Sequence, residues 1–471
     1  MPASISGMKM EENVAFATET DRRWILKKET LLRFVLTLML SVGSVSFVEP
    51  SPYEILFFIL LPVAVFGHFV ITRVTLTLFF IIAAFLIAET ASLVPYFEHR
   101  PMGLDNDNTG TPALYTLETI YLFSSAVLFA MIFTRHTPAR LTLGLRAFAF
   151  SSVVAAVWAI MAYLHVQGFT VSERDVGRVS GPFKDPNVLG SYCVLGALYL
   201  MQRFIIGSPR ARLFHLAGLA ITLFGGIFLP LSRGAWGAMA FSTVFLIVAT
   251  YVTADDRAMR RKIAMSIFGI VILVAGAGVY IASNSDLRDS VSDRAKLEQD
   301  YDGGETGRFG NQKRSIPMLI ERPLGFGPHR FMVYFDLDPH NSYIGAFSSA
   351  GWVGGLTFFL MVAVTSVIGL RLAFRRSPYL RQAQVVVPAL LSAFLQAFQI
   401  DIDHWRFVFL MIGAVWGMEA ARVQAVSVSR MLSRERPAPA PAPRARPDAA
   451  PQTARYPFGP RPRPGGAPDI F

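Results

Sequence analysis

Long apolar segments recur along the chain and indicate a protein that lies in a membrane. A helix needs roughly 20 apolar residues to cross the hydrocarbon core of a bilayer. Overall, 53% of the residues are hydrophobic and only 16% are charged, whereas soluble domains carry about 25% charged residues. The sequence therefore predicts an all-α, polytopic integral membrane protein with about 12 transmembrane helices. The apolar segments cover residues 32–49, 53–71, 74–94, 113–134, 142–165, 186–206, 212–231, 235–253, 263–283, 343–371, 383–401 and 404–424.

The connections between these segments define the expected domain organisation. Residues 284–341 form a long polar connection, and structureless connections of that length are usually functional. We expect a short helix within it, at about residues 308–322. The chain end is rich in Pro, Ala and Arg and lacks the apolar content to fold. The predicted parts are an N-terminal segment (1–31), transmembrane helices 1–9 (32–283), the long outer loop (284–341), transmembrane helices 10–12 (342–425) and a disordered tail (426–471).

The basic residues are distributed in a way that predicts the orientation of the chain. No signal peptide pattern precedes the first apolar segment, so we expect a cytoplasmic N-terminus. With that start, alternate loops carry an excess of Lys and Arg, which is typical of the cytoplasmic face. An even number of spans also makes the C-terminus cytoplasmic. The net charge of +11 therefore reports membrane topology, and it gives no reason to expect a nucleic-acid partner. The loops assigned to the cytoplasm contain Arg73, Arg135, Arg140, Arg203, Arg210, Arg212, Arg257, Arg260, Arg261, Lys262, Arg371, Arg375, Arg376 and Arg381.

Ionisable residues gather at the outer ends of the predicted spans. Glu89 and Glu118 lie near the outer ends of the third and fourth spans, and Asp401 and Asp403 lie near the outer end of the eleventh. Charges inside or beside spans are costly and often mark functional sites. Transporters more often place such groups near the midplane, so this pattern favours chemistry at the outer surface. Hydration at the interface is an equally good explanation of Glu89 and of Glu118 taken singly.

A second group of charged residues consists of cations in the outer loops. Arg174, Arg178 and Lys184 share one loop, and Arg233 lies in the next outer turn. A guanidinium group can hold two phosphate oxygens at once, so these residues could bind a lipid pyrophosphate. Contact with phospholipid head groups is the alternative. Arg233 fits that alternative least well, because its turn between two apolar spans has almost no other polar side chain.

His340 is the candidate catalytic base. The long outer loop ends in DPHNSY, where Asn341 or Ser342 could cap a helix that begins beside the histidine. The positive end of the helix dipole should lower the pKa of His340 and keep the imidazole neutral. Glycines at Gly351, Gly354 and Gly355 predict a kink or close packing early in that helix.

Binding of a divalent metal ion is the alternative to chemistry by a histidine base. The outer face holds three D-x-D patterns, and carboxylate pairs of this kind can bind a divalent ion through their oxygens. Such patterns also arise by chance in turns. We therefore expect neither a metal nor a cofactor, and the single cysteine, Cys193, excludes an intrachain disulfide. The three patterns are Asp105 with Asp107, Asp336 with Asp338, and Asp401 with Asp403.

Several motifs together resemble those of the O-antigen ligase and polymerase superfamily of bacterial surface-polysaccharide enzymes. The resemblance covers most of the chain except the tail, and its motifs are short. It rests on the order of about 12 spans and on the stretches SGPFKDPNVLGSY, SRGAW, ERPLGFGPHRF and DPHNSY. The resemblance implies a GT-C-like architecture in the bacterial inner membrane, with both termini cytoplasmic and the active site in the periplasmic loop.

The resemblance also implies an activity and its site residues. The implied reaction moves a glycan from undecaprenyl pyrophosphate to an acceptor hydroxyl, on the lipid A core for a ligase or on another carrier-linked glycan for an O-antigen or exopolysaccharide polymerase. A transporter or flippase for a lipid-linked glycan is the non-enzymatic alternative. By this resemblance, His340 and Arg233 are the catalytic residues of a metal-independent, inverting transferase. The resemblance assigns substrate binding to Arg174, Arg178, Lys184, Arg308, His404 and Arg406.

Overall fold

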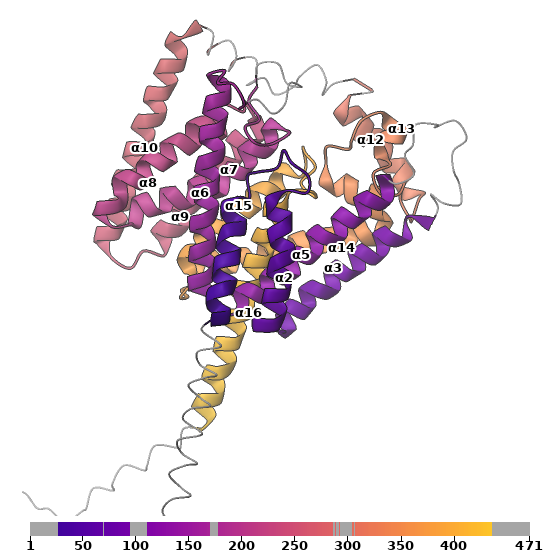
Figure 1. The fold of residues 1–471 in the computed structure, drawn as a ribbon, viewed down its shortest axis with the longest axis horizontal. Helices are drawn as coiled ribbons and strands as arrows, with labels where there is room; N and C mark the ends of the chain where they lie inside the picture. The colour runs from indigo at the N-terminus through magenta and orange to yellow at the C-terminus, as the bar shows by residue number, and fades with distance from the viewer. Residues whose placement is uncertain are drawn as a thin grey trace, which may run out of the picture. The chain divides into compact units, whose positions relative to one another are not determined.

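The computed structural model describes residues 27–68, 70–94, 111–169, 178–285, 288, 292, 304–305 and 307–435. Regular structure in these residues is entirely helical (Figure 1). An unlabelled helix over residues 27–41 precedes the labelled ones. The labelled helices are α2 (Pro52–His68), α3 (Arg73–Ala91), α5 (Thr111–Thr134), α6 (Thr137–Tyr163), α7 (Pro186–Ile206), α8 (Pro209–Ile221), η1 (Thr222–Phe228), α9 (Arg233–Val252), α10 (Arg257–Ser283), α12 (Arg308–Ile320), α13 (Phe331–Phe335), α14 (Ser342–Phe374), α15 (Leu380–Gln396) and α16 (Arg406–Glu435).

Eight helical stretches in the described part of the chain are long and apolar enough to cross a membrane. The chain is therefore a multi-pass membrane protein, as its composition predicts. The remaining four apolar segments coincide with the helix at 27–41 and with α2, α10 and α15, so the count of 12 stays a prediction. The eight stretches are 73–91, 112–134, 137–163, 186–206, 209–228, 233–252, 342–374 and 406–427.

The helices pack in pairs around one apolar core. Helix α14 lies along α3, α15 packs on α9, and α7 packs on α6 (Figure 1). Aromatic residues fill much of the core, among them Phe123, Phe129 and Trp416, which are at most 1% exposed. Cys193 is fully buried among these residues, as its place in an apolar segment predicts.

A kink at Gly351 lets the outer loop pack against α14. The residue has φ 63°, and a Cβ there would lie 2.2 Å from the Pro323 carbonyl oxygen, so only glycine fits. The next residue, Trp352, donates its backbone N–H to that same oxygen at 2.9 Å. The kink predicted from the glycines is therefore confirmed. A small separate core beside it consists of Leu319, Phe326, Phe331 and Phe335.

The C-terminal residues form a second unit, Ala425–Phe471. Helix α16 continues to Glu435, past residue 426, where the tail is predicted to begin. The rest of the predicted tail, residues 436–471, lies outside the described residues.

Candidate functional site

His340 lies immediately before the N-terminus of α14. The next residue, Asn341, is the N-cap, and its side-chain oxygen accepts hydrogen bonds from the backbone N–H groups of Tyr343 and Ile344, both at 3.1 Å. The predicted cap is confirmed, because a short polar side chain at this position satisfies amides that the helix itself leaves unpaired. His340 has a left-handed backbone with φ 45°. This uncommon conformation is held in place by the contacts described next.

Asp401 holds His340 in position. Its two carboxylate oxygens accept the backbone N–H groups of His340 and Asn341, each at 3.0 Å. The same carboxylate lies 3.5 Å from the imidazole Nδ1 of His340. The histidine side chain is 41% exposed, so its other ring nitrogen, Nε2, is the one available to a substrate. The arrangement is that of an imidazole oriented by a carboxylate.

The charge of Asp401 corrects the prediction made for the His340 pKa. We expected the helix dipole to lower it, but the hydrogen bond and charge of the Asp401 carboxylate raise the pKa of His340. The reason is physical, because a full negative charge at 3.5 Å outweighs the partial charge at a helix terminus. His340 is therefore a stronger base than the sequence predicts.

The loop from Ala397 to Trp405 carries Asp401 and is tied to the start of α14. The Ser342 backbone N–H donates to the Ala397 carbonyl at 2.8 Å. The Ser342 hydroxyl donates to the Ile400 carbonyl at 3.2 Å and accepts from the Ile402 backbone N–H at 2.7 Å. These bonds involve the residues on either side of Asp401 in the chain, so they hold its carboxylate beside His340.

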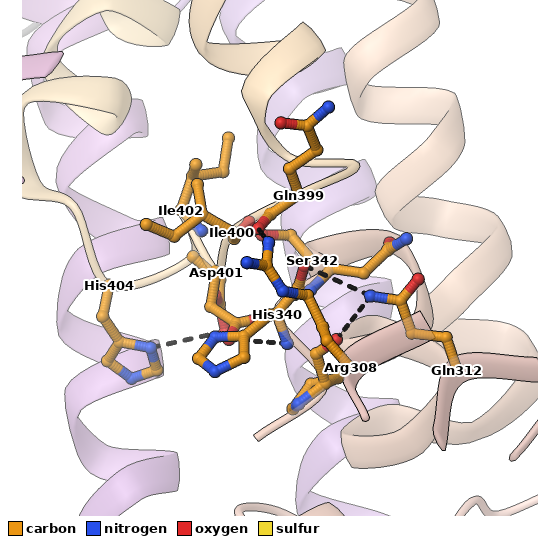
Figure 2. A network of polar contacts seen from close by, with 12 residues as sticks. Arg308, Gln312, His340, Ser342, Gln399, Ile400, Asp401, Ile402 and His404 are labelled. Carbon is orange, nitrogen blue, oxygen red and sulfur yellow. Dashed lines mark hydrogen bonds and ion pairs between the residues drawn. The ribbon is translucent and has the colours of Figure 1, made fainter. Parts of the chain in front are cut away.

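Helix α12 closes the other side of this loop. The Arg308 guanidinium donates to the Gln399 carbonyl at 2.9 Å, and the Gln312 amide donates to the Pro339 carbonyl at 2.9 Å (Figure 2). The helix begins at Arg308, which confirms the short helix predicted in the outer loop. Figure 2 shows that α12, the His340 turn and the Asp401 loop meet at one place, so Arg308 lies beside the candidate base.

Two further predicted cations lie at the starts of α7 and α9. Arg178 donates to the Pro230 carbonyl at 3.0 Å and to the Asn187 side chain at 2.9 Å. Arg233 is the first residue of α9. The two helix starts come close because Gly190 of α7 has no side chain, and a Cβ there would lie 2.5 Å from the Cβ of Ala235.

Helix α15 connects these cations to the Asp401 loop. The Ser191 hydroxyl of α7 donates to the Gln396 side-chain oxygen at 2.8 Å. A Cβ on Gly234 of α9 would lie 3.0 Å from that same oxygen. Gln396 is the last residue of α15 and directly precedes the loop that carries Asp401. The structure therefore brings Arg178, Arg233 and His340 to a common end of the helices.

Other predicted site residues have intramolecular partners elsewhere. Arg406 contacts Glu54 at 2.6 Å and Ser51 at 2.8 Å, and Lys184 forms an ion pair with Glu49. Arg406 thus contacts the start of α2, and Lys184 contacts the segment before it. Arg174 lies outside the described residues.

His404 belongs to a second carboxylate–imidazole pair. Its Nδ1 lies 3.4 Å from Asp403, which also accepts the Tyr115 hydroxyl at 2.8 Å. Burial alone would lower the pKa of His404, but the Asp403 carboxylate raises it. Its Nε2 is buried and lies 3.9 Å from Glu118. His404 therefore pairs with Asp403 through Nδ1, while its enclosed Nε2 has no hydrogen-bond partner among the described residues.

The described residues contain no cluster of side chains that would support the metal-binding alternative. No group of three or more His, Cys, Asp or Glu side chains there could hold an ion. Asp401 and Asp403 each face a histidine. Asp105 and Asp107 lie outside the described residues.

Comparison with known protein families finds a similarity over part of the chain. Residues 218–359 match the family model described as O-antigen ligase. This similarity over part of the chain agrees with the resemblance of its motifs to the O-antigen ligase and polymerase superfamily. This match runs from α8 into α14 and includes Arg233, Arg308 and His340. The match supports a likeness to glycosyltransferase-like enzymes, and the long apolar helices are those of a membrane protein. A search of curated proteins finds no match to the chain.

Sequence reasoning missed the partner of His340. The sequence marks Asp401 only as an outer-end charge and as part of a D-x-D pattern, because the two residues lie 61 positions apart in the chain. The cluster of polar residues after α15, Gln396 to His404, is the one sequence signal that could have pointed to it.

Proposed function

We propose that this protein is an O-antigen ligase-like glycosyltransferase. It moves a glycan from undecaprenyl pyrophosphate to a sugar hydroxyl of the lipid A core, at the periplasmic face of the inner membrane. The observation that carries the proposal is the His340–Asp401 pair at the start of α14, with Arg308 beside it. Both termini are cytoplasmic in this proposal, and the site lies in the periplasm.

His340 acts as the general base. Asp401 faces Nδ1 and leaves Nε2 to accept the proton of the acceptor hydroxyl. The acceptor oxygen forms a bond to the anomeric carbon as the bond from that carbon to the pyrophosphate oxygen breaks. A direct displacement of this kind inverts the anomeric centre. General-base catalysis contributes about 10²–10⁴ to the rate.

The cations hold the donor and stabilise the leaving group. Arg178, Arg233 and Arg308 come from three separate segments of the chain, and guanidinium groups match the geometry of phosphate oxygens. Pre-placed positive charge at a group that becomes more negative is usually the largest catalytic term. The pyrophosphate supplies the free energy of transfer, so the reaction needs no nucleotide and no metal. His404 and Arg406 position this end of the helices through their protein contacts.

Reconstitution tests whether the protein forms bonds. The full chain in liposomes, given a labelled undecaprenyl-pyrophosphate glycan and lipid A core, should produce a glycan attached to the core, with undiminished yield in the presence of a chelator. Movement of the label across the bilayer without a new glycosidic bond would identify a transporter instead. Arg233→Lys should weaken donor binding, because an ammonium group cannot reproduce the two-pronged contact.

Deletion of the protein in its own cell separates the enzyme classes. Lipopolysaccharide reduced to bare core is the result that the ligase proposal predicts. Core carrying one repeat would identify an O-antigen polymerase, and intact lipopolysaccharide with loss of a secreted polymer would identify an exopolysaccharide polymerase.

A further inference from the structure

Glu89 is a carboxylate buried inside a membrane-spanning helix. It lies in the last turn of α3 and is 1% exposed. Neither of its side-chain oxygens has a hydrogen-bond partner in the described part of the chain. A buried, unpaired carboxylate is costly, and more so in a membrane. An interfacial, hydrated glutamate, which the sequence allows, does not fit these observations.

The carboxyl group of Glu89 faces a small cavity that also reaches the candidate site. The cavity has a volume of about 10 Å³, which is room for roughly one water molecule. Its polar lining includes Asp403 from the loop that carries Asp401, and Ser342 from the first turn of α14. The other lining residues are Phe85, Glu89, Tyr115, Thr119, Phe123, Gly345, Ala346, Ser349 and Phe358.

Asp403 presents an unsatisfied oxygen to the same cavity. Its Oδ2 contacts Tyr115 and His404, but its Oδ1 is buried and has no partner among the described residues. Burial alone would raise the pKa of Asp403, but its hydrogen bond with His404 lowers it, so this residue is the ionised member of the pair. Two facing carboxylates in one enclosed space need a proton between them.

Three of the hydroxyl groups around the cavity already donate to other acceptors. Tyr115 donates to Asp403 Oδ2, Thr119 donates to the Tyr115 carbonyl, and Ser342 donates to the Ile400 carbonyl. A proton on Glu89 would make its carboxyl group a donor toward the buried Oδ1 atom of Asp403 and would remove one of the two facing negative charges.

We propose that Glu89 is protonated at neutral pH and donates, through one water molecule in the cavity, to Asp403 Oδ1, so that it acts as a positioning residue for the loop carrying Asp401. This inference builds on the proposed function. When Glu89 loses its proton to solution, a second negative charge faces Asp403 and the loop is pushed away from α14. Transfer then falls at alkaline pH.

The other charged and titratable groups around Glu89 fit this proposal. After its burial and the nearby Thr119 hydroxyl, the charges of His404 and Asp403 act on it most. From α5, Tyr115 faces the cavity and Glu118 lies beyond His404. From the segment before α13, His329 stacks on Tyr115 with ring centroids 5.2 Å apart, and Arg330 is buried.

Infrared spectroscopy of the full chain in lipid nanodiscs tests the protonation state without any substrate. At neutral pH the wild type should show the carbonyl stretch of a protonated carboxylic acid, and Glu89→Gln should lack it. Glu118→Gln is the matched control, since Glu118 is 58% exposed and should leave the band unchanged. A wild-type spectrum without the band at neutral pH overturns the proposal. Loss of the band when sodium replaces potassium in the buffer also overturns the proposal. It would show that a bound sodium ion, and not a proton, occupies the cavity.

The pH dependence of transfer tests the positioning role. Glu89→Gln keeps a donor toward Asp403 but cannot ionise, so it should retain neutral activity within about twofold and lose the alkaline decline. Glu118→Gln should keep the decline, and Glu89→Ala should reduce transfer about tenfold at neutral pH. An alkaline decline that persists unchanged in Glu89→Gln overturns the positioning role. If the infrared band is present and no protein forms glycosidic bonds, the proposed function fails while the protonation of Glu89 stands.

Discussion

Two carboxylate–imidazole pairs share the loop after α15, and their surroundings differ. The His340–Asp401 and His404–Asp403 pairs have almost equal Nδ1-to-oxygen distances, 3.5 Å and 3.4 Å. Asp401 also binds two backbone amides at the start of α14, and the His340 side chain is 41% exposed. The His404 side chain is 27% exposed, its Nε2 is buried, and its ring packs on Tyr115 with centroids 4.3 Å apart.

This difference shows that the second ring nitrogen decides what a carboxylate–imidazole pair can do. In the first pair that nitrogen can reach a substrate, so the histidine can accept a proton from a hydroxyl. In the second pair it is enclosed by protein, so the histidine links α5 to the loop. In the proposed function, the same local chemistry therefore serves catalysis in the first pair and positioning in the second.

The largest effect should come from removing the base. His340→Ala should lower transfer by about 10²–10⁴-fold and leave donor binding unchanged, because the cations that hold the donor are separate residues. Single-turnover transfer and binding of a labelled carrier-linked glycan measure the two effects. Normal transfer by this variant would end the assignment of His340.

Removing the carboxylate of the same pair should have the next largest effect. Asp401→Asn keeps the size of the side chain but loses its charge, so transfer should fall about 10- to 100-fold, a part of the general-base contribution. The same single-turnover assay measures it. If Asp403→Asn reduced transfer as much as Asp401→Asn, the two pairs would not differ in function as proposed.

The enclosed histidine should matter more for stability than for rate. His404→Ala leaves Asp403 without its imidazole partner and should cost about 1–3 kcal/mol of stability, while transfer falls tenfold or less. Thermal unfolding in nanodiscs, followed together with transfer, provides the comparison. A rate loss as large as that of His340→Ala would show that His404 takes part in the chemistry.

The smallest effect concerns the hydroxyl that holds Asp403. Tyr115→Phe removes one hydrogen bond of 2.8 Å and should cost about 1 kcal/mol of stability, with transfer within about twofold of wild type. Unfolding of the purified variant measures this change. A large drop in rate would mean that the enclosed pair controls the catalytic pair more tightly than the separate contacts indicate.

The sequence predicts local features of this site well. Asn341 as a cap, Gly351 as a kink and Arg308 as the start of a helix all depend on residues close together in the chain, and all three are confirmed. The helical spans follow from the length of the apolar segments alone. In the described residues, eight of the about 12 predicted spans are helices long and apolar enough to cross a membrane.

Contacts between distant segments could not be predicted in this way. Asp401 beside His340, Glu54 beside Arg406 and Asp403 on the cavity of Glu89 depend on how helices pack. The predicted direction of the His340 pKa shift was wrong for this reason. The prediction depends on the helix that follows the residue, whereas the Asp401 carboxylate on the loop packed against it has the larger effect. The assignments of Arg178, Arg233 and Arg308 to the donor stay predictions.

The pH dependence of single-turnover transfer by wild type and Asp401→Asn tests most directly whether His340 is a base raised by Asp401. Protonated imidazole cannot accept a proton, so wild-type transfer should fall as the pH decreases through the raised pKa of His340. Without the carboxylate that pKa should move down toward the ordinary value of about 6.5, and the acidic decline should move to lower pH with it. An acidic decline at the same pH in both proteins would contradict the account.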